Sequence, residues 1–160
     1  MNKNDLINDF ISGETKGKAS NLYIEGDKLV NYSTVIAFRC STSGHSDIIL
    51  VNTDYYSMTT RQNQCNIIRS MYYGYKIPDE KAFYRTMSYL KTYGFTPELK
   101  EQLEMLSLNI SMAEGRKEDR PKGVTKKMAG ENLMKRIEEF RKFLITPKEE
   151  IESKEVAITE

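Results

Sequence analysis

One change of hydrophobic pattern constrains the fold of this chain more than any other feature. Before residues 51–69, short apolar runs rich in β-branched side chains alternate with turn residues, which is typical of strands. After them, apolar residues recur every three or four positions, which is typical of amphipathic helices. Because adjacent short strands with short connections favour antiparallel pairing, we expect an α+β fold, an N-terminal antiparallel β-meander followed by three to four α-helices.

The strand half begins after a short helix and a loop. Leu6 and Phe10 share one face of that helix, and the polar, glycine-containing residues 13–20 are predicted to be a loop. Gly26 and Asp27 then separate two apolar runs, which suits a tight hairpin. The predicted strands are residues 22–25, 28–32, 34–40 and 47–52.

The helical half carries start and stop signals. Thr59 or Thr60 is expected to cap the first long helix, with Gln62 completing a capping box and Gly74 ending the helix. Its apolar stripe is predicted to be Cys65, Ile68 and Tyr72. The later helices are expected to open at 78–80, 96–98 and 131, the last after a linker at 115–130.

The charge distribution suggests how the chain is divided. The net charge of +1 gives no general attraction to nucleic acid, but residues 116–148 hold 11 Lys/Arg against 5 Asp/Glu. Residues 149–160 hold 1 Lys/Arg against 5 Asp/Glu. We expect a meander-plus-helix domain at 10–75, a helical extension at 78–146, and a disordered acidic tail at 147–160.

Several classes of site find no support in the pattern. His45 is the only histidine and lies in a predicted turn, and Cys40 and Cys65 are too far apart for paired metal ligands. No phosphate-binding or dinucleotide-binding glycine motif occurs. We therefore expect no metal, no cofactor and no catalytic residue. Without a leader or an apolar run long enough to span a bilayer, the expected location is the host-cell cytoplasm, with no membrane contact.

The corner between the last predicted strand and the first long helix gathers hydroxyl and amide side chains. Free backbone N–H groups at such a junction favour anions, and tyrosine suits partner surfaces because it joins an apolar body to a polar tip. The alternative is that these residues only cap the helix and cover the sheet. The predicted partner-binding residues are Tyr55, Tyr56, Ser57, Thr59, Thr60, Arg61, Gln64 and Arg69.

Aromatic and basic side chains together also suit single-stranded nucleic acid, because rings stack on bases while cations neutralise phosphates. A single-stranded nucleic-acid binder or a metal-free ribonuclease is therefore the alternative function. It would add the basic stretch that holds Arg116, Lys117, Arg120, Lys122, Lys126 and Lys127.

Four ordered blocks of the sequence, at residues 13–29, 32–37, 49–52 and 56–64, carry a resemblance. Together they resemble a small domain frequent in phages of low-GC Gram-positive bacteria, over roughly residues 10–75. Members often have histidine where this chain has Asn63, so the resemblance implies no imidazole-dependent mechanism here, and no catalytic residue carries over. It implies a phage or prophage accessory protein, and such small proteins frequently bind host machinery, CRISPR effectors included.

The favoured function is therefore a phage-encoded accessory binding protein, of the anti-CRISPR type, that inhibits host defence by contact with a host protein or nucleoprotein complex. A structural or assembly protein, in which the last two helices pair between chains, is a further hypothesis. The oligomeric state stays open at this point.

Overall fold

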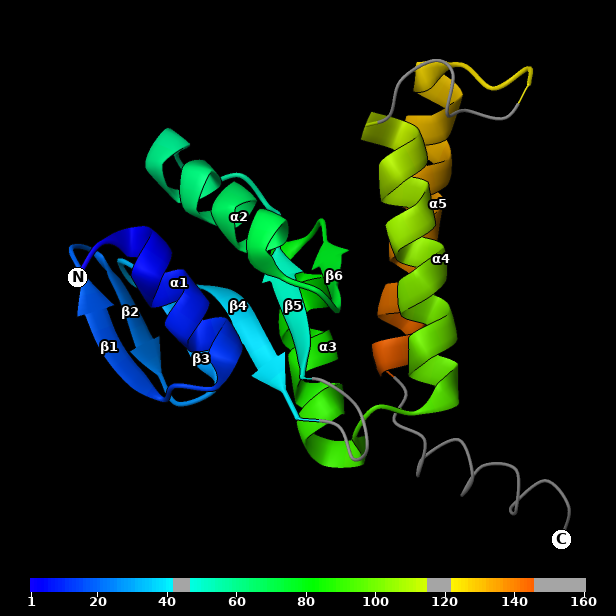
Figure 1. Ribbon diagram of the computed structural model, residues 1–160. Helices are drawn as coiled ribbons and strands as arrows, with labels where there is room; N and C mark the ends of the chain where they lie inside the picture. Colours follow the sequence, from blue (N-terminus) through cyan, green and yellow to red (C-terminus); the bar gives the residue numbers. More distant parts are fainter. Residues whose placement is uncertain (42–46, 115–121, 146–160) are drawn as a thin grey trace, which may run out of the picture. The chain divides into compact units, whose positions relative to one another are not determined.

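A six-stranded sheet followed mainly by helices forms this α+β protein, which confirms the predicted fold class (Figure 1). The computed structural model describes residues 1–41, 47–114 and 122–145. Within these ranges, no helix is both long enough and apolar enough to cross a membrane. The elements are α1 (Lys3–Ser12), β1 (Lys16–Ala19), β2 (Leu22–Glu25), β3 (Lys28–Asn31), β4 (Thr34–Cys40), β5 (Ile48–Asn52), α2 (Met58–Ser70), β6 (Gly74–Ile77), α3 (Glu80–Tyr93), α4 (Pro97–Glu114) and α5 (Lys126–Ile145).

The strands lie in the sheet in chain order, from β1 to β6. The pairs from β1 to β5 are antiparallel, as the meander prediction requires, and the hairpin at Gly26 and Asp27 joins β2 to β3 as expected. The last pair differs, because β6 runs parallel to β5. Parallel neighbours need a crossover connection, and α2 provides it.

Two strands were missed by the sequence prediction. Residues 13–20 were expected to be a loop, yet β1 lies there, with Gly17 so close to α1 that a Cβ atom would lie 2.7 Å from Leu6 Cδ1. Gly74 was expected to end a helix, yet it begins β6, where a Cβ would lie 2.3 Å from the Ile49 carbonyl oxygen. Both glycines permit a close approach between segments, which local pattern does not reveal.

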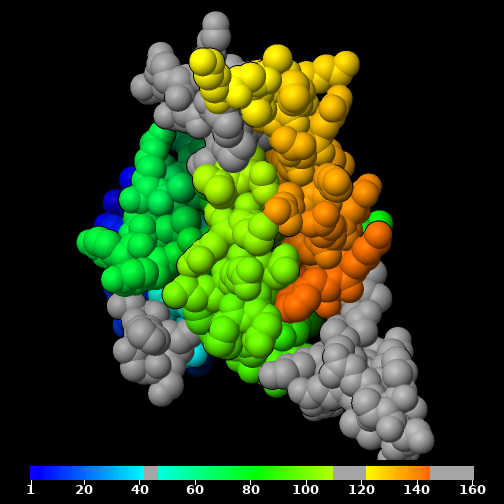
Figure 2. Space-filling view, turned by 90° about the vertical axis from the view of Figure 1, so that its right-hand side faces the viewer, coloured from blue at the N-terminus to red at the C-terminus, as the bar shows by residue number. Residues whose placement is uncertain are grey.

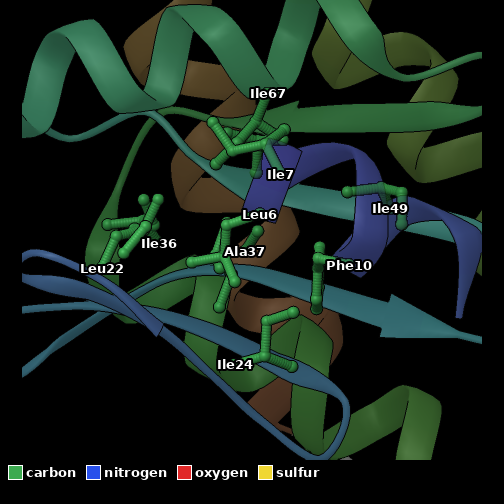
Figure 3. Close-up of a cluster of buried hydrophobic side chains, with 12 residues drawn as sticks. Leu6, Ile7, Phe10, Leu22, Ile24, Ile36, Ala37, Ile49 and Ile67 are labelled. Carbon is green, nitrogen blue, oxygen red and sulfur yellow. The ribbon is translucent and has the colours of Figure 1, made fainter. Parts of the chain in front are cut away.

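Helices α1 and α2 cover one face of the sheet and bury a contiguous apolar core (Figure 3). Leu6, Ile7 and Phe10 come from α1, and Ile67 comes from α2. Against them lie side chains of the strands. The buried members of this core are Leu6, Ile7, Phe10, Ala19, Leu22, Ile24, Leu29, Ile36, Ala37, Ile49, Val51 and Ile67.

Arg39 fastens the end of α1 to the sheet. Its guanidinium donates to the backbone carbonyls of Phe10, Glu14 (3.1 Å) and Gly26 (3.2 Å), and it lies 5.0 Å from the centre of the Phe10 ring. Arg39 is 8% exposed, so these carbonyls share a donor that water replaces poorly.

We expect Arg39→Met to lower the free energy of unfolding by about 2 kcal/mol, because carbonyls near the end of α1 lose their donor. Urea denaturation followed by circular dichroism measures the change. Arg69→Met, at an exposed position of α2, is the matched control and should stay within about 0.5 kcal/mol of the parent. Equal stability of the two variants would contradict the fastening role of Arg39.

The chain divides into two compact units, residues 1–83 and 84–160. In the second unit α4 and α5 lie side by side along their lengths (Figures 1 and 2). Thr96 caps α4 through a bond from the Leu99 amide (3.1 Å), which confirms the predicted start. The start of α5 was predicted too late. It begins at Lys126, after Thr125 accepts from the Met128 amide (3.2 Å), so the predicted linker ends earlier than Gly130.

The expected domain limits, 10–75, 78–146 and 147–160, stay predictions, because the structure does not test them. The acidic tail at 147–160 lies outside the described residues.

Candidate site at the strand-to-helix corner

The inward face of α2 is mostly polar. Thr60, Asn63, Gln64 and Ile67 are its buried residues, spaced i, i+3, i+4 and i+7 along one side of the helix. Thr60 is 3% exposed, Asn63 2% and Gln64 0%, which is unusual for such side chains unless they are hydrogen-bonded. The question is therefore where their hydrogen bonds go.

Two of these residues bond to the end of β3. Asn31 Nδ2 donates to Thr60 Oγ1 at 2.7 Å, and Asn63 Nδ2 donates to Asn31 Oδ1 at 2.8 Å. Ser57 Oγ lies 3.0 Å from Thr60 Oγ1. We call these four residues, Asn31, Ser57, Thr60 and Asn63, the Asn31 cluster. It joins the first turns of α2 to a strand that lies about thirty residues earlier in the chain.

Gln64 closes the other side of the corner. Its Nε2 donates to the carbonyls of Asn52 (2.7 Å) and Asp54 (2.9 Å), where the chain leaves β5. Asn52 Nδ2 donates to the Tyr56 hydroxyl at 2.7 Å, and burial raises the pKa of that hydroxyl well above its ordinary value. Tyr56 therefore stays protonated. These bonds fix the path from β5 into α2 from within.

This arrangement corrects the predictions for α2. Ser57 is the N-cap, accepting from the Thr60 amide at 3.2 Å, so neither Thr59 nor Thr60 caps the helix and the capping box with Gln62 is wrong. Of the predicted apolar stripe of Cys65, Ile68 and Tyr72, only Ile68 packs against the core. Tyr72 lies beyond the helix and is 92% exposed, and Cys65 is only half-buried. The buried stripe is polar because its partners are polar groups at the ends of β3 and β5.

The eight predicted contact residues therefore fall into two groups. Thr60 and Gln64 are buried and hold the corner together, and Ser57 and Tyr56 are half-buried in the same bonding. The outward group, which we call the α2 outer face, includes Met58, which the sequence analysis did not select although it is 81% exposed. The α2 outer face consists of Tyr55, Met58, Thr59, Arg61 and Arg69.

A stacked pair stands at the N-terminal end of this face. The Arg61 guanidinium lies 5.4 Å from the centre of the Tyr55 ring, and Tyr55 is 59% exposed. Residues 55–76 contain no Asp or Glu, while Arg61, Arg69 and Lys76 supply positive charge. The face therefore offers an aromatic surface with cationic side chains, which suits an anionic or polar partner surface.

The residues of the nucleic-acid alternative are only partly described. Arg116, Lys117 and Arg120 lie outside the described residues. Lys126 and Lys127 are exposed in the first turn of α5, where they oppose the helix dipole, and Lys122 is exposed in the turn before the helix.

No group of three His, Cys, Asp or Glu side chains that could hold a metal occurs in the part of the chain that the structure describes. His45 lies outside it. Burial raises the pKa of the Cys40 thiol, so this group is no activated nucleophile.

Asn31 was missed as a member of this corner, and Asn52 and Asn63, which lie within residues 51–69, were not selected as contact residues. The spacing of Thr60, Asn63, Gln64 and Ile67 places them on one helix face. Sequence analysis predicts that a mostly polar helix face is exposed to solvent, so this spacing did not indicate burial. The chain matches no protein-family model, no curated protein and no solved structure.

Proposed function

We propose that this protein is a phage-encoded accessory protein that acts by contact, docking through the α2 outer face onto a host protein or nucleoprotein complex and inhibiting host defence in the manner of an anti-CRISPR protein. The observation that supports action by contact is the Tyr55–Arg61 pair at the surface of a corner that the buried hydrogen bonds of Gln64 hold in place. The biological setting is part of this proposal, and its ground is the set of sequence blocks within residues 10–75 that resembles small phage domains.

The corner suits binding because its exposed side chains stand on a preorganised base. Tyrosine and arginine are the residues that most often dominate binding energy at protein interfaces. Each loses less conformational freedom on binding when the backbone beneath it is already fixed, and here Gln64 and the Asn31 cluster fix it. Stacking on Tyr55 also holds the Arg61 guanidinium in place before a partner arrives.

The first test is an affinity capture from host lysate, paired with a phage-plating assay in a host that carries a defence system. We expect the protein to raise plating efficiency and to capture a component of that system. The double variant Tyr55→Ala/Arg61→Ala should lower the captured amount roughly tenfold or more and abolish the gain in plating, because hot-spot residues contribute about 2 kcal/mol or more each.

The matched control is Lys16→Ala/Lys18→Ala on the edge strand β1, which removes more positive charge from exposed positions elsewhere in the same unit. It should capture and plate as the parent does. If the Tyr55/Arg61 variant performs as well as this control, the α2 outer face is not the docking surface.

Binding to single-stranded nucleic acid is the second candidate, favoured by the exposed lysines at the start of α5 and by the lack of acidic residues at 55–76. The same capture experiment separates the two. Nuclease treatment of the lysate should leave capture intact if the contact is with protein. Loss of capture after that treatment, together with a steep fall with salt, would favour nucleic acid.

A further inference from the structure

A hollow of about 500 Å³ lies where the end of α1, the start of β5 and the loop from α2 to β6 meet. Two consecutive tyrosines of this loop line it, and they are among the most exposed large side chains of the described chain: Tyr72 at 92% and Tyr73 at 62%. Two adjacent exposed rings beside a hollow form a contiguous apolar surface, which is a feature of interaction sites. The remaining lining residues are Ile11, Ser12, Asp47 and Ile49.

The hollow offers a partner one partly exposed carboxylate. Asp47 is the charged residue among those that line it. The C-terminal end of α1 also lies here, and its Phe10 carbonyl already accepts from the Arg39 guanidinium. Arg39 lies 4.0 Å from the Asp47 carboxylate, but its side chain is 7% exposed and donates to backbone carbonyls. A partner in solvent therefore meets the carboxylate of Asp47 rather than the cation of Arg39.

We propose that this hollow receives an arginine side chain of the protein partner, with the guanidinium against the rings of Tyr72 and Tyr73 and bonded to the Asp47 carboxylate. This inference rests on the proposed function and gives the partner a chemistry. A planar guanidinium stacks on tyrosine and bonds a carboxylate through two N–H groups at once, which a lysine ammonium cannot do. Phosphates of nucleic acid would be repelled by Asp47.

The hollow lies beyond the C-terminal end of α2, whereas Tyr55 and Arg61 of the α2 outer face lie at its N-terminal end. The helix is thirteen residues long, which is roughly 20 Å at 1.5 Å per residue. An extended segment covers that length with about six residues. The partner segment that satisfies both ends carries an acidic or polar group for Arg61 and, about six residues away, an arginine for the hollow.

Short synthetic peptides test the hollow without the natural partner. We expect acetyl-Gly-Arg-Gly-amide to shift the backbone amide resonances of Asp47, Tyr72 and Tyr73 saturably, with a dissociation constant in the millimolar range that a single-residue contact allows. The lysine analogue should bind more weakly, and the glutamate analogue should not shift these resonances. Equal shifts with the arginine and glutamate peptides, or none with either, would overturn the proposal, and equal binding of lysine would overturn the choice of arginine.

Variants of the full chain complete the test. Tyr72→Ala cannot disturb the core, since Tyr72 is almost fully exposed. This variant should bind the arginine peptide about fivefold more weakly than the parent does. Asp47→Asn should bind the arginine peptide roughly tenfold or more weakly than the parent does. Tyr55→Ala/Arg61→Ala should leave peptide binding unchanged, so a failure of the α2 outer face in the capture assay is distinguishable from a failure of the hollow. Unaltered binding in Tyr72→Ala and Asp47→Asn would overturn the assignment.

Discussion

Replacing Gly74 with alanine should destabilise the first unit by roughly 3 kcal/mol or more, which corresponds to a fall in melting temperature of roughly 15 °C for a unit of this size. The added Cβ would lie 2.3 Å from the carbonyl oxygen of Ile49 and 2.7 Å from Met71 Sδ. A flexible thioether can move aside, but a backbone oxygen within the β5–β6 pair cannot move without breaking that pairing. Differential scanning calorimetry of the purified variant measures the fall.

Gly130→Ala is the matched control, because it adds the same methyl group within a helix where no atom lies within 4 Å of the new Cβ. It should stabilise α5 by about 0.5–1 kcal/mol, since alanine favours helix over glycine by that amount. The two substitutions are chemically identical and are expected to have opposite signs. A Gly74→Ala variant that melts with the parent would show that β6 does not pack against β5 as closely as described.

The parts of the fold that sequence predicted are those in which neighbours along the chain are also neighbours in space. The hairpin at Gly26 and Asp27 needs only its own turn and flanking apolar residues, and the start of α4 needs only Thr96, Pro97 and Glu98. The continuous apolar run of β5 likewise marks a strand buried on both faces, and all five of its residues are buried. These signals are local, so pattern alone suffices.

The parts that sequence missed depend on contacts between distant segments. Residues 74–77 form a strand because they pair with β5. Position 74 requires glycine because the Ile49 carbonyl leaves no room for a Cβ atom. Likewise, Thr60 and Asn63 on one helix face indicate an exposed surface when the sequence is considered alone. In the structure both residues are hydrogen-bonded to Asn31. Hydrogen-bond partners nearly thirty residues apart leave no periodic signal. The corner was therefore located from sequence, but which of its side chains point inward was not.

The sharpest test of the inward group is Asn63→Ala, which should cost roughly 3 kcal/mol of unfolding free energy. The substitution removes the donor to Asn31 Oδ1 and leaves a buried acceptor unpaired next to a small cavity. Asn66→Ala, one turn along α2 and half-buried without a described bond, makes the same chemical change and should stay within about 0.5 kcal/mol of the parent.

A double-mutant cycle with Asn31→Ala then isolates the pair. Because the two side chains share one hydrogen bond, we expect the double variant to be less destabilised than the sum of the single variants, by about 1 kcal/mol in denaturant unfolding. Additive effects would mean that the asparagines act independently. The cycle also bears on function, because a corner loosened at Asn63 should weaken capture of the partner although Asn63 is 2% exposed and lies beneath the α2 outer face. Unchanged capture by a folded Asn63→Ala protein would mean that Tyr55 and Arg61 do not need the rigid base that these bonds supply.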